Sequence, residues 1–288
     1  MDCISQKAYA KINLAIDLLG KRPDNYNEVK MIMQTIDIYD TVYMEKIEKG
    51  IVIECDDNKV PSDERNIAYK ATQYMFDKYN IKEGLKIIIE KKIPVAAGLA
   101  GGSADAACVI KGINKLFNLG LDKKTLMKIG EKIGADVPYC MCKNTALATG
   151  IGEKIEKLQN IGAVDIILIK PKFSISTAMV YKEFDYSMPK VRPNFDILLK
   201  AIENNEIDVI AKNMVNVLET VTERKNPIIA KIKDQLVKNG AMGALMSGSG
   251  PSIFAIFKDE NTAKNAYQIM KDDSLYESFL TKTICFKK

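Results

Sequence analysis

The sequence predicts an α+β protein built from two domains. Period-two alternation, typical of strands, and three- to four-residue spacing, typical of helices, both recur along the chain. A strand pattern restarts at Val164 after a polar segment, which favours a domain boundary near residues 155–163. The chain has 288 residues, 47% of them hydrophobic, which is enough for two cores, and we expect domains at 1–158 and 159–288.

The N-terminal half is predicted to start with a strand. Between Ala8 and Leu18, apolar residues alternate with mixed ones, which predicts a half-buried strand that displays Lys11 beside Asn13. A Pro-Asp-Asn cluster marks a turn after this strand. The next predicted elements are an extended segment at 29–47, a helix at 66–79 and a strand at 85–94.

Two helices are predicted in the middle of the chain. Apolar residues at intervals of three and four within 106–117 predict the first helix, which Ser103 caps or begins. Asp122 and Gly134 are typical cap and stop residues of the second, which places Asp136 in a short turn. The later predicted elements are a strand at 164–171, helices within 194–218 and 227–239, a helix near 262–272 and a final strand at 281–287.

Histidine is absent from the chain. This excludes Ser-His-Asp triads, Cys-His pairs and histidine metal sites, so any general base must be a carboxylate, Lys, Tyr or Cys. The net charge of +5 suits an anionic small-molecule substrate but falls well short of a nucleic-acid-binding composition. No stretch has the length and apolarity of a membrane span, and we expect a cytoplasmic protein that binds neither nucleic acid nor membrane.

The most informative stretch is residues 94–104, PVAAGLAGGSA, between a predicted strand and a predicted helix. It lacks the G-K-[ST] ending of a P-loop and does not match G-x-G-x-x-G. Small residues nevertheless let backbone N–H groups approach phosphate oxygens, the helix start attracts anions, and Ser103 is placed to reach a phosphate or its Mg2+. A tight turn that packs helix against strand explains the same residues, so both interpretations stay open.

Three other features are ambiguous when each is taken alone. The cluster SGSGPS at 247–252 fits a functional glycine loop or an ordinary hairpin turn. Lys11 fits a catalytic ammonium group or a solvated strand residue. Asp136 fits a carboxylate base or a helix cap.

Eight segments, taken in chain order, carry a family resemblance. They are AKINLAIDLLGKRPDNYNEV, MIMQTIDIYD, VPSDERNIAYKA, IPVAAGLAGGSADAA, IGADVPYCM, ATGIGE, SISTAMVY and GALMSGSGPSIFAIF. Together they resemble the GHMP kinase superfamily, which includes galactokinase, homoserine kinase, mevalonate kinase and phosphomevalonate kinase. The resemblance implies an N-terminal domain of the ribosomal protein S5 domain 2-like type and a C-terminal ferredoxin-like domain, with an active site in the cleft between them.

The resemblance also implies roles for individual residues. Asp136 would accept the proton of the attacking hydroxyl, Lys11 would favour the developing negative charge, and Ser103 would lie near Mg2+. The implied ATP-binding residues are Pro94, Val95, Ala96, Ala97, Gly98, Leu99, Ala100, Gly101, Gly102, Ser103 and Ala104, with Asn66 and Ile67 near the adenine. The implied substrate contacts are Asn13, Tyr26, Asn27 and Tyr181.

Within the family, the resemblance is greatest to the branch that phosphorylates the 2-hydroxyl of 4-diphosphocytidyl-2-C-methyl-D-erythritol in non-mevalonate isoprenoid biosynthesis. This implies an ATP-dependent small-molecule kinase that uses ATP and Mg2+ and works as a monomer or weak homodimer. Two alternatives stay open. One is a GHMP kinase for homoserine, mevalonate or a sugar, and the other is a non-catalytic relative that binds nucleotide or RNA.

Several positions depart from the family pattern. The usual turn R-P-D-G-Y-H here has Asn25 for glycine and Asn27 for histidine. Asn adopts positive φ more readily than most residues, so Asn25 is tolerable, whereas Asn27 replaces a histidine expected to hydrogen-bond cytosine. Ala100 stands where glycine is common, which matters if that position needs a positive φ or a very close phosphate approach. Residues 216–219 read N-V-L-E where N-D-L-E is frequent.

Overall fold

The computed structural model describes residues 2–286 and divides into two compact units. Unit 1 contains the residues before Lys11 together with 38–95 and 100–142, and unit 2 contains 11–37, 96–99 and 143–288. The units are interleaved along the chain because two long strands, β1 (Cys3–Lys21) and β2 (Asn27–Ile47), each supply residues to both. The sequential domain boundary at 158/159 stays a prediction.

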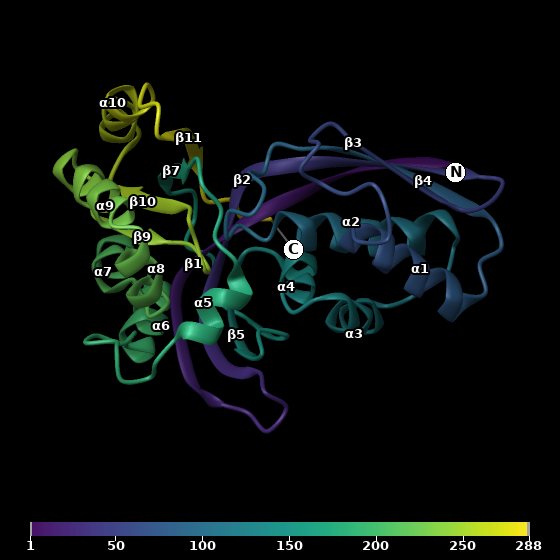
Figure 1. Cartoon of the computed structure of the whole chain (residues 1–288), viewed down its shortest axis with the longest axis horizontal. Helices are drawn as coiled ribbons and strands as arrows, with labels where there is room; N and C mark the ends of the chain where they lie inside the picture. The colour runs from purple at the N-terminus through teal and green to yellow at the C-terminus, as the bar shows by residue number, and fades with distance from the viewer. Residues whose placement is uncertain (1, 287–288) are drawn as a thin grey trace. The chain divides into compact units, whose positions relative to one another are not determined.

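Unit 1 is a sheet with helices on one face (Figure 1). Besides parts of β1 and β2 it contains β3 (Ile51–Cys55), β4 (Gly84–Glu90), α1 (Ile67–Tyr79), α2 (Gly101–Leu116), α3 (Lys123–Ile133) and α4 (Val137–Cys142). The strand order is β3–β4–β2–β1, with β4 antiparallel to β2 and parallel to β3. Alternate residues of β4, namely Leu85, Ile87 and Ile89, are fully buried, as the period of a strand with one core face requires.

Two helices of unit 1 begin where the sequence predicts, at side-chain caps. Asn66 Oδ1 accepts the Ala68 N–H at 2.9 Å at the start of α1. Asp122 Oδ1 accepts the Thr125 N–H at 2.8 Å at the start of α3, which ends at Gly134 as expected. These caps satisfy first-turn N–H groups that have no partner inside the helix.

The start of α2 differs from its prediction. The helix begins at Gly101, after Ala100 in the left-handed conformation, and Ser103 lies inside the first turn instead of capping it. Because the cap residue is an alanine, its side chain accepts no hydrogen bond from the first turn. The N-terminus of α2 therefore presents backbone N–H groups without a side-chain cap.

The part of the seven-stranded sheet that belongs to unit 2 buries β1 on both faces. Its strand order is β6–β5–β2–β1–β8, with β5 (Thr145–Gly150), β6 (Lys154–Lys157) and β8 (Val215–Asn216). Lys11, Asn13 and Asp17 are only 4%, 1% and 6% exposed, so the predicted half-buried strand is wrong for this part of β1. Burial is tolerated because these side chains are hydrogen-bonded, Lys11 to Asn13 and Asp17 to Arg192.

The second sheet of unit 2 is antiparallel, in the order β11–β7–β10–β9 (Figure 1). Its strands are β7 (Asp165–Pro171), β9 (Gly243–Met246), β10 (Ile253–Phe257) and β11 (Tyr276–Lys282), and the helices of the unit are α5 (Thr177–Glu183), α6 (Phe195–Glu203), α7 (Ile207–Asn213), α8 (Glu219–Lys225), α9 (Ile228–Lys238) and α10 (Glu260–Met270). With several helices between β7 and β9, and α10 between β10 and β11, the elements follow the β-α-β-β-α-β succession of ferredoxin-like folds.

One prediction in unit 2 needs correction. The final strand occupies 276–282 and does not start at 281, because it pairs in full register with β7, and Lys287 of the predicted strand lies outside the described residues. The helices predicted within 194–218 are confirmed as α6 and α7, after which Val215 and Asn216 pair with β1. Within residues 2–286, no helix combines the length and apolarity needed to cross a bilayer.

Candidate functional site

Lys11 lies in the buried part of β1 and contacts the glycine-rich stretch directly. Its Nζ donates to Asn13 Oδ1 at 2.6 Å and to the Gly98 carbonyl at 3.0 Å. Its backbone N–H donates to the Leu99 carbonyl at 3.1 Å. The two oxygens that accept from Lys11 Nζ are both neutral, so these contacts orient the ammonium group without cancelling its charge.

The loop at 94–104 contains three residues with positive φ, Ala96, Gly98 and Ala100, at 51°, 75° and 57°. At Gly98 this conformation is combined with a close neighbour, since a Cβ there would lie 2.2 Å from the Ser247 carbonyl oxygen. Ala100 does need a positive φ, which costs an L-residue other than glycine about 1 kcal/mol or more. The departure from glycine at this position is therefore a source of strain.

Glycines also allow close packing within unit 1. A Cβ on Gly101 would lie 3.1 Å from Ile93 Cγ2, and one on Gly102 would lie 3.2 Å from Ile67 Cγ2. Packing thus explains part of the glycine content. The start of α2 nevertheless carries the partial positive charge of a helix N-terminus, so a packing turn and an anion-binding loop are compatible interpretations of the same residues.

Unit 1 brings the predicted adenine segment next to two other predicted segments. Ile67 lies beside Gly102, and its Cδ1 would lie 3.3 Å from a Cβ built on Gly134, just before the turn that contains Asp136. Residues on both sides of Asn66 line an open surface pocket of about 420 Å3. The lining residues are Ser62, Asp63, Glu64, Arg65 and Tyr69.

Asp136 lies in the turn between α3 and α4, as predicted, and is partly exposed. Its backbone carbonyl accepts the Cys140 N–H at 3.0 Å, so the turn leads directly into α4. Asp136 belongs to unit 1 and Lys11 to unit 2. Their action as a catalytic pair stays a prediction.

The turn after β1 is held by charged side chains. Arg22 contacts Asp24 at 3.0 Å and Glu28 at 2.9 Å, and Asp24 Oδ1 accepts the Tyr26 N–H at 3.1 Å. Asn25 has a φ of 66°, so it does occupy the conformation in which the family pattern has glycine. Tyr26 is 60% exposed at the end of this turn.

Asn27 has a hydrogen-bond partner that the sequence did not predict. The Tyr186 hydroxyl donates to Asn27 Oδ1 at 2.7 Å, and Arg192 donates to the Tyr186 carbonyl at 2.9 Å. Because Oδ1 accepts this bond, the Nδ2 group is the side of the Asn27 amide that can donate to a ligand. Tyr181 lies on α5 in the same unit.

The SGSGPS cluster at 247–252 is a hairpin loop that also contacts the glycine-rich stretch. β9 and β10 pair antiparallel on either side of it, so the hairpin interpretation is confirmed. Ser247 Oγ donates to the Gly98 carbonyl at 3.0 Å, and Asn216 Nδ2 donates to the Gly248 carbonyl at 2.8 Å. The N-V-L-E motif marks residues 216–219 in the sequence, but not this contact, which joins segments more than thirty positions apart in the chain.

A buried charge cluster of Asp40, Lys91 and Asp105 in unit 1 also escaped prediction. Lys91 Nζ donates to Asp40 and, at 2.8 Å, to Asp105 Oδ2, while Asp40 Oδ1 accepts the N–H groups of Lys92 and Ile93. Within residues 2–286, Asp105 Oδ1 is buried and makes no hydrogen bond. Burial raises the pKa of Asp105 to about 7, with Lys91 opposing the shift and the charge of Asp40 adding to it.

Known proteins resemble this chain over its whole length. Family models for the GHMP kinases N terminal domain and the GHMP kinases C terminal domain match residues 66–144 and 198–274. The 4-diphosphocytidyl-2-C-methyl-D-erythritol kinase of Acetivibrio thermocellus is 52% identical, over 99% of this chain and 100% of its own.

Two solved structures show the same fold. A crystal structure of 4-(cytidine 5'-diphospho)-2C-methyl-D-erythritol kinase has a TM-score of 0.83 at 25% identity, covering 98% of this chain and 100% of the other. Homoserine kinase from Cytophaga hutchinsonii has a TM-score of 0.78 at 22% identity, covering 99% of this chain and 95% of the other. The predicted fold class, a two-domain GHMP kinase with mixed helix and sheet, is confirmed. The chain belongs to the GHMP kinase family and is an ATP-dependent small-molecule kinase.

Proposed function

We propose that this protein transfers the γ-phosphoryl group of ATP to the 2-hydroxyl of 4-diphosphocytidyl-2-C-methyl-D-erythritol, a step of non-mevalonate isoprenoid precursor synthesis. The observation that carries the substrate is the 52% identity to the Acetivibrio thermocellus kinase of that name, over nearly all of both chains. The contact of the Lys11 ammonium with the Gly98 carbonyl supports the reaction class. We expect a cytoplasmic monomer or weak homodimer without nucleic-acid partners.

In this proposal residues 94–104 bind the phosphates of ATP. The first turn of α2 supplies backbone N–H groups and the positive end of a 16-residue helix. Asn66 and Ile67 lie near the adenine. The Asn66 side chain is already engaged, since Oδ1 caps α1 and Nδ2 donates to the Pro61 carbonyl at 2.8 Å. We therefore expect Asn66 to shape the adenine pocket and not to hydrogen-bond the base.

Mg2+ enters the proposal as the metal of Mg-ATP. In the part of the chain that the structure describes, no three His, Cys, Asp or Glu side chains gather into a metal site. Such a site is not required, because Mg2+ is usually held by substrate phosphates and water with one or two protein oxygens. Ser103 fits this role, since it is partly exposed in the first turn of α2. Bound Mg2+ supplies charge neutralisation to the transferred phosphoryl group.

The chemistry is assigned to Asp136 and Lys11. Asp136 accepts the proton of the attacking hydroxyl, and Lys11 stabilises the negative charge that develops on its oxygen. Asn13 holds Lys11 through Oδ1, while its Nδ2 group faces the Met31 sulfur at 3.7 Å. Because a thioether is a weak acceptor, the Nδ2 group is suited to donate to a substrate oxygen instead.

The cytosine end of the substrate is assigned to Tyr26, Tyr181 and Asn27. Tyr26 and Tyr181 stack on the flat base, which uses aromatic faces in an ordinary way. Asn27 donates from Nδ2 to an acceptor on cytosine, because its Oδ1 already accepts the Tyr186 hydroxyl.

The test is ADP release by the purified protein with Mg-ATP and one acceptor at a time. The acceptors are 4-diphosphocytidyl-2-C-methyl-D-erythritol, homoserine, mevalonate and galactose. We expect turnover with the first of these. Turnover confined to one of the other three acceptors would overturn the substrate assignment. Salt-sensitive RNA binding without any turnover would overturn the proposed enzymatic function.

A companion variant, Asn27→His, tests the base contact. We expect it to change the KM for the cytidine substrate more than the KM for ATP, because the proposal places Asn27 against the cytosine and not against ATP. Asn239→His is the matched control, since Asn239 is partly exposed at the end of α9, where its Nδ2 donates to the Gln235 carbonyl at 2.8 Å. An unchanged cytidine KM in Asn27→His would remove this residue from base recognition.

A further inference from the structure

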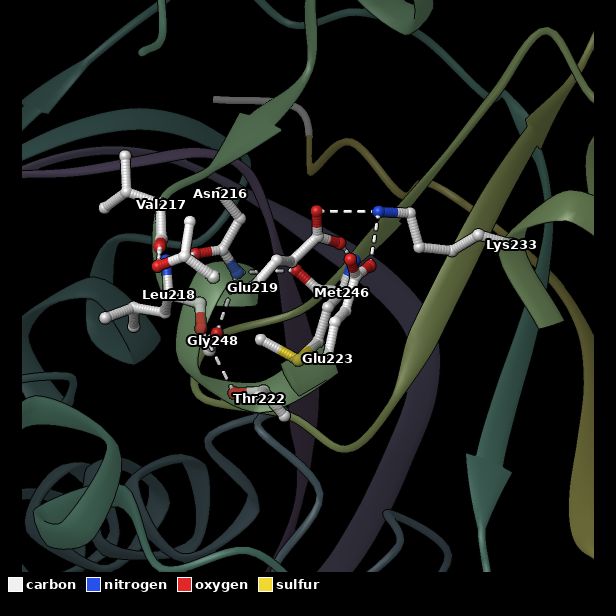
Figure 2. Close-up of polar contacts among 10 residues, drawn as sticks. Asn216, Val217, Leu218, Glu219, Thr222, Glu223, Lys233, Met246 and Gly248 are labelled. Carbon is white, nitrogen blue, oxygen red and sulfur yellow. Dashed lines mark hydrogen bonds and ion pairs between the residues drawn. The ribbon is translucent and has the colours of Figure 1, made fainter. Parts of the chain in front are cut away.

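Asn216 uses its whole amide group to hold the hairpin loop. Its Nδ2 donates to the Met246 and Gly248 carbonyls, each at 2.8 Å, and its Oδ1 accepts the Leu218 N–H at 3.0 Å (Figure 2). The side chain is 2% exposed, so these bonds are shielded from water. Asn216 itself is fixed because it pairs with Ile16 of β1.

Glu219 holds the same loop through the N–H group of Met246. Its Oε1 accepts the Met246 N–H at 2.8 Å, and its Oε2 accepts Lys233 Nζ at 2.7 Å (Figure 2). Lys233 also donates to Glu223 at 2.8 Å. Asn216 and Glu219 thus engage both the carbonyl and the N–H of Met246, the residue that precedes SGSGPS. We call these two side chains the loop clamp.

The clamped loop contacts the carbonyl against which Lys11 is oriented. Ser247 Oγ and Lys11 Nζ both donate to the Gly98 carbonyl, each at 3.0 Å. A Cβ on Gly98 would lie 2.2 Å from the Ser247 carbonyl oxygen, and one on Gly248 would lie 3.0 Å from the Gly98 carbonyl oxygen. These distances leave no space for a side chain at Gly98 or Gly248, and a movement of the loop away from Gly98 would release the Ser247 hydrogen bond.

We propose that the loop clamp, Asn216 and Glu219, positions the Lys11 ammonium by fixing the hairpin loop that holds the Gly98 carbonyl. This rests on the proposed function, in which Lys11 acts on the attacking hydroxyl. A lysine side chain has a flexible four-carbon stem, so its direction depends on the acceptors that hold its end. A displacement of about 1 Å at a reacting group commonly costs a factor of up to about a hundred in rate.

The first variant is Asn216→Asp, which keeps the shape of the side chain and replaces the donor group by an oxygen. That oxygen faces the Met246 and Gly248 carbonyls, so the loop is repelled where it was held. We expect kcat to fall about ten- to a hundredfold, with a smaller change in the KM for ATP. Asn239→Asp is the matched control, because the same chemical change there faces one exposed helix carbonyl.

A double-mutant cycle with Lys11→Met separates positioning from general damage. The acceptor is whichever compound the unaltered protein phosphorylates in the substrate panel, so failure of the proposed substrate leaves the cycle intact. If the clamp acts through Lys11, Asn216→Asp lowers kcat less than about twofold further in the Lys11→Met protein. The same fold loss in both backgrounds would overturn the proposal, as would full turnover in Lys11→Met.

Glu219→Gln is the second variant, for use also where Asn216→Asp does not fold. It keeps an oxygen for the Met246 N–H but loses the carboxylate that Lys233 binds. We expect a smaller loss of kcat than in Asn216→Asp, and again little further loss in the Lys11→Met background. A loss of kcat that is unchanged by Lys11→Met would show that Glu219 acts elsewhere.

Discussion

Each unit contains a cluster of two carboxylates and one lysine, and the two clusters are satisfied to different degrees. In unit 2, Glu219 uses both oxygens, and its partner Lys233 is 21% exposed. In unit 1, Lys91 is 7% exposed, and Asp105 Oδ1 is buried without a hydrogen bond to any of residues 2–286. Both clusters hold backbone N–H groups, and burial raises the pKa of one carboxylate in each, Glu219 and Asp105. The comparison teaches that the unit 1 cluster differs in the deeper burial of its lysine and in the pKa of Asp105, which is raised to about 7.

The largest expected difference between the two clusters is in the effect of removing their lysines. Lys91→Met leaves two buried carboxylates without their cation, and we expect a loss of about 3–5 kcal/mol in unfolding free energy. Lys233→Met leaves carboxylates that are less buried, with Glu219 14% and Glu223 29% exposed, so we expect a smaller loss of about 1.5 kcal/mol. Urea unfolding at neutral pH measures both. Equal losses would show that burial does not distinguish the clusters.

Each unit is also expected to supply one catalytic side chain. Lys11→Met in unit 2 and Asp136→Asn in unit 1 should each lower kcat at least about a hundredfold. The reason is that one oriented group lowers the activation barrier by about 3–4 kcal/mol, and the variant loses this stabilisation. ADP release measures the rate, and unfolding curves check that the fold is intact. Near-normal turnover in either variant would remove that residue from the mechanism.

Asp105 makes the unit 1 cluster sensitive to pH. Its folded-state pKa of about 7 lies above the ordinary value of 3.8, so the folded protein binds this proton more tightly than the unfolded chain. The resulting stability is fully present below about pH 4 and is lost as the pH rises to about 7, by up to about 1.4 kcal/mol per pH unit. Asp105→Asn cannot titrate and should lack this loss.

Urea unfolding of Asp105→Asn and the unaltered protein, at several pH values, checks this slope. Asp122→Asn is a control of opposite sign, because its hydrogen bonds to Thr125 lower the pKa of Asp122. The stability that Asp122 contributes is lost as the pH falls. Parallel pH profiles for Asp105→Asn and the unaltered protein would contradict the assignment.

The smallest effect concerns the glycine-rich loop, where both units contain a strained alanine. Ala100→Gly in unit 1 and Ala96→Gly in unit 2 relieve the strain of an alanine at a positive φ, which is 57° at Ala100 and 51° at Ala96. After the larger backbone entropy of glycine is deducted, we expect a gain of about 0.5–1 kcal/mol from each. Ala107→Gly, at a buried position within α2, is the control and should lose at least about 1 kcal/mol, because it also removes a packed methyl group.

Sequence reasoning located the local features of the fold well. Asn66, Asp122 and Gly134 delimit helices as predicted, because a cap is a hydrogen bond between residues two to four positions apart. The prediction that Ser103 caps α2 is wrong, because the helix already starts at Gly101. Ala100 precedes this start in a left-handed conformation that alanine does not favour, so the loop imposes it and local sequence preference does not reveal it.

The contacts that the sequence did not reveal join distant residues. Lys91 and Asp40 are 51 positions apart, and Tyr186 and Asn27 are 159 positions apart. No periodicity or spacing rule connects such pairs, because their proximity depends on strand register and on the packing of helices against the sheet.

The sequence by itself determined the kinase family, the glycine-rich loop and the candidate residues Lys11 and Asp136. The reason is that the order of the motifs can be read along the chain, and that local hydrogen bonds join residues only a few positions apart. Only the tertiary structure decided that Lys11 is buried with Asn13 and Gly98 as acceptors and that SGSGPS is a hairpin held by Asn216 and Glu219. It also decided that Asp105 Oδ1 is buried without a hydrogen bond among the described residues. The physical reason is that burial and hydrogen-bond satisfaction belong to the space around a side chain, which segments from elsewhere in the chain enclose.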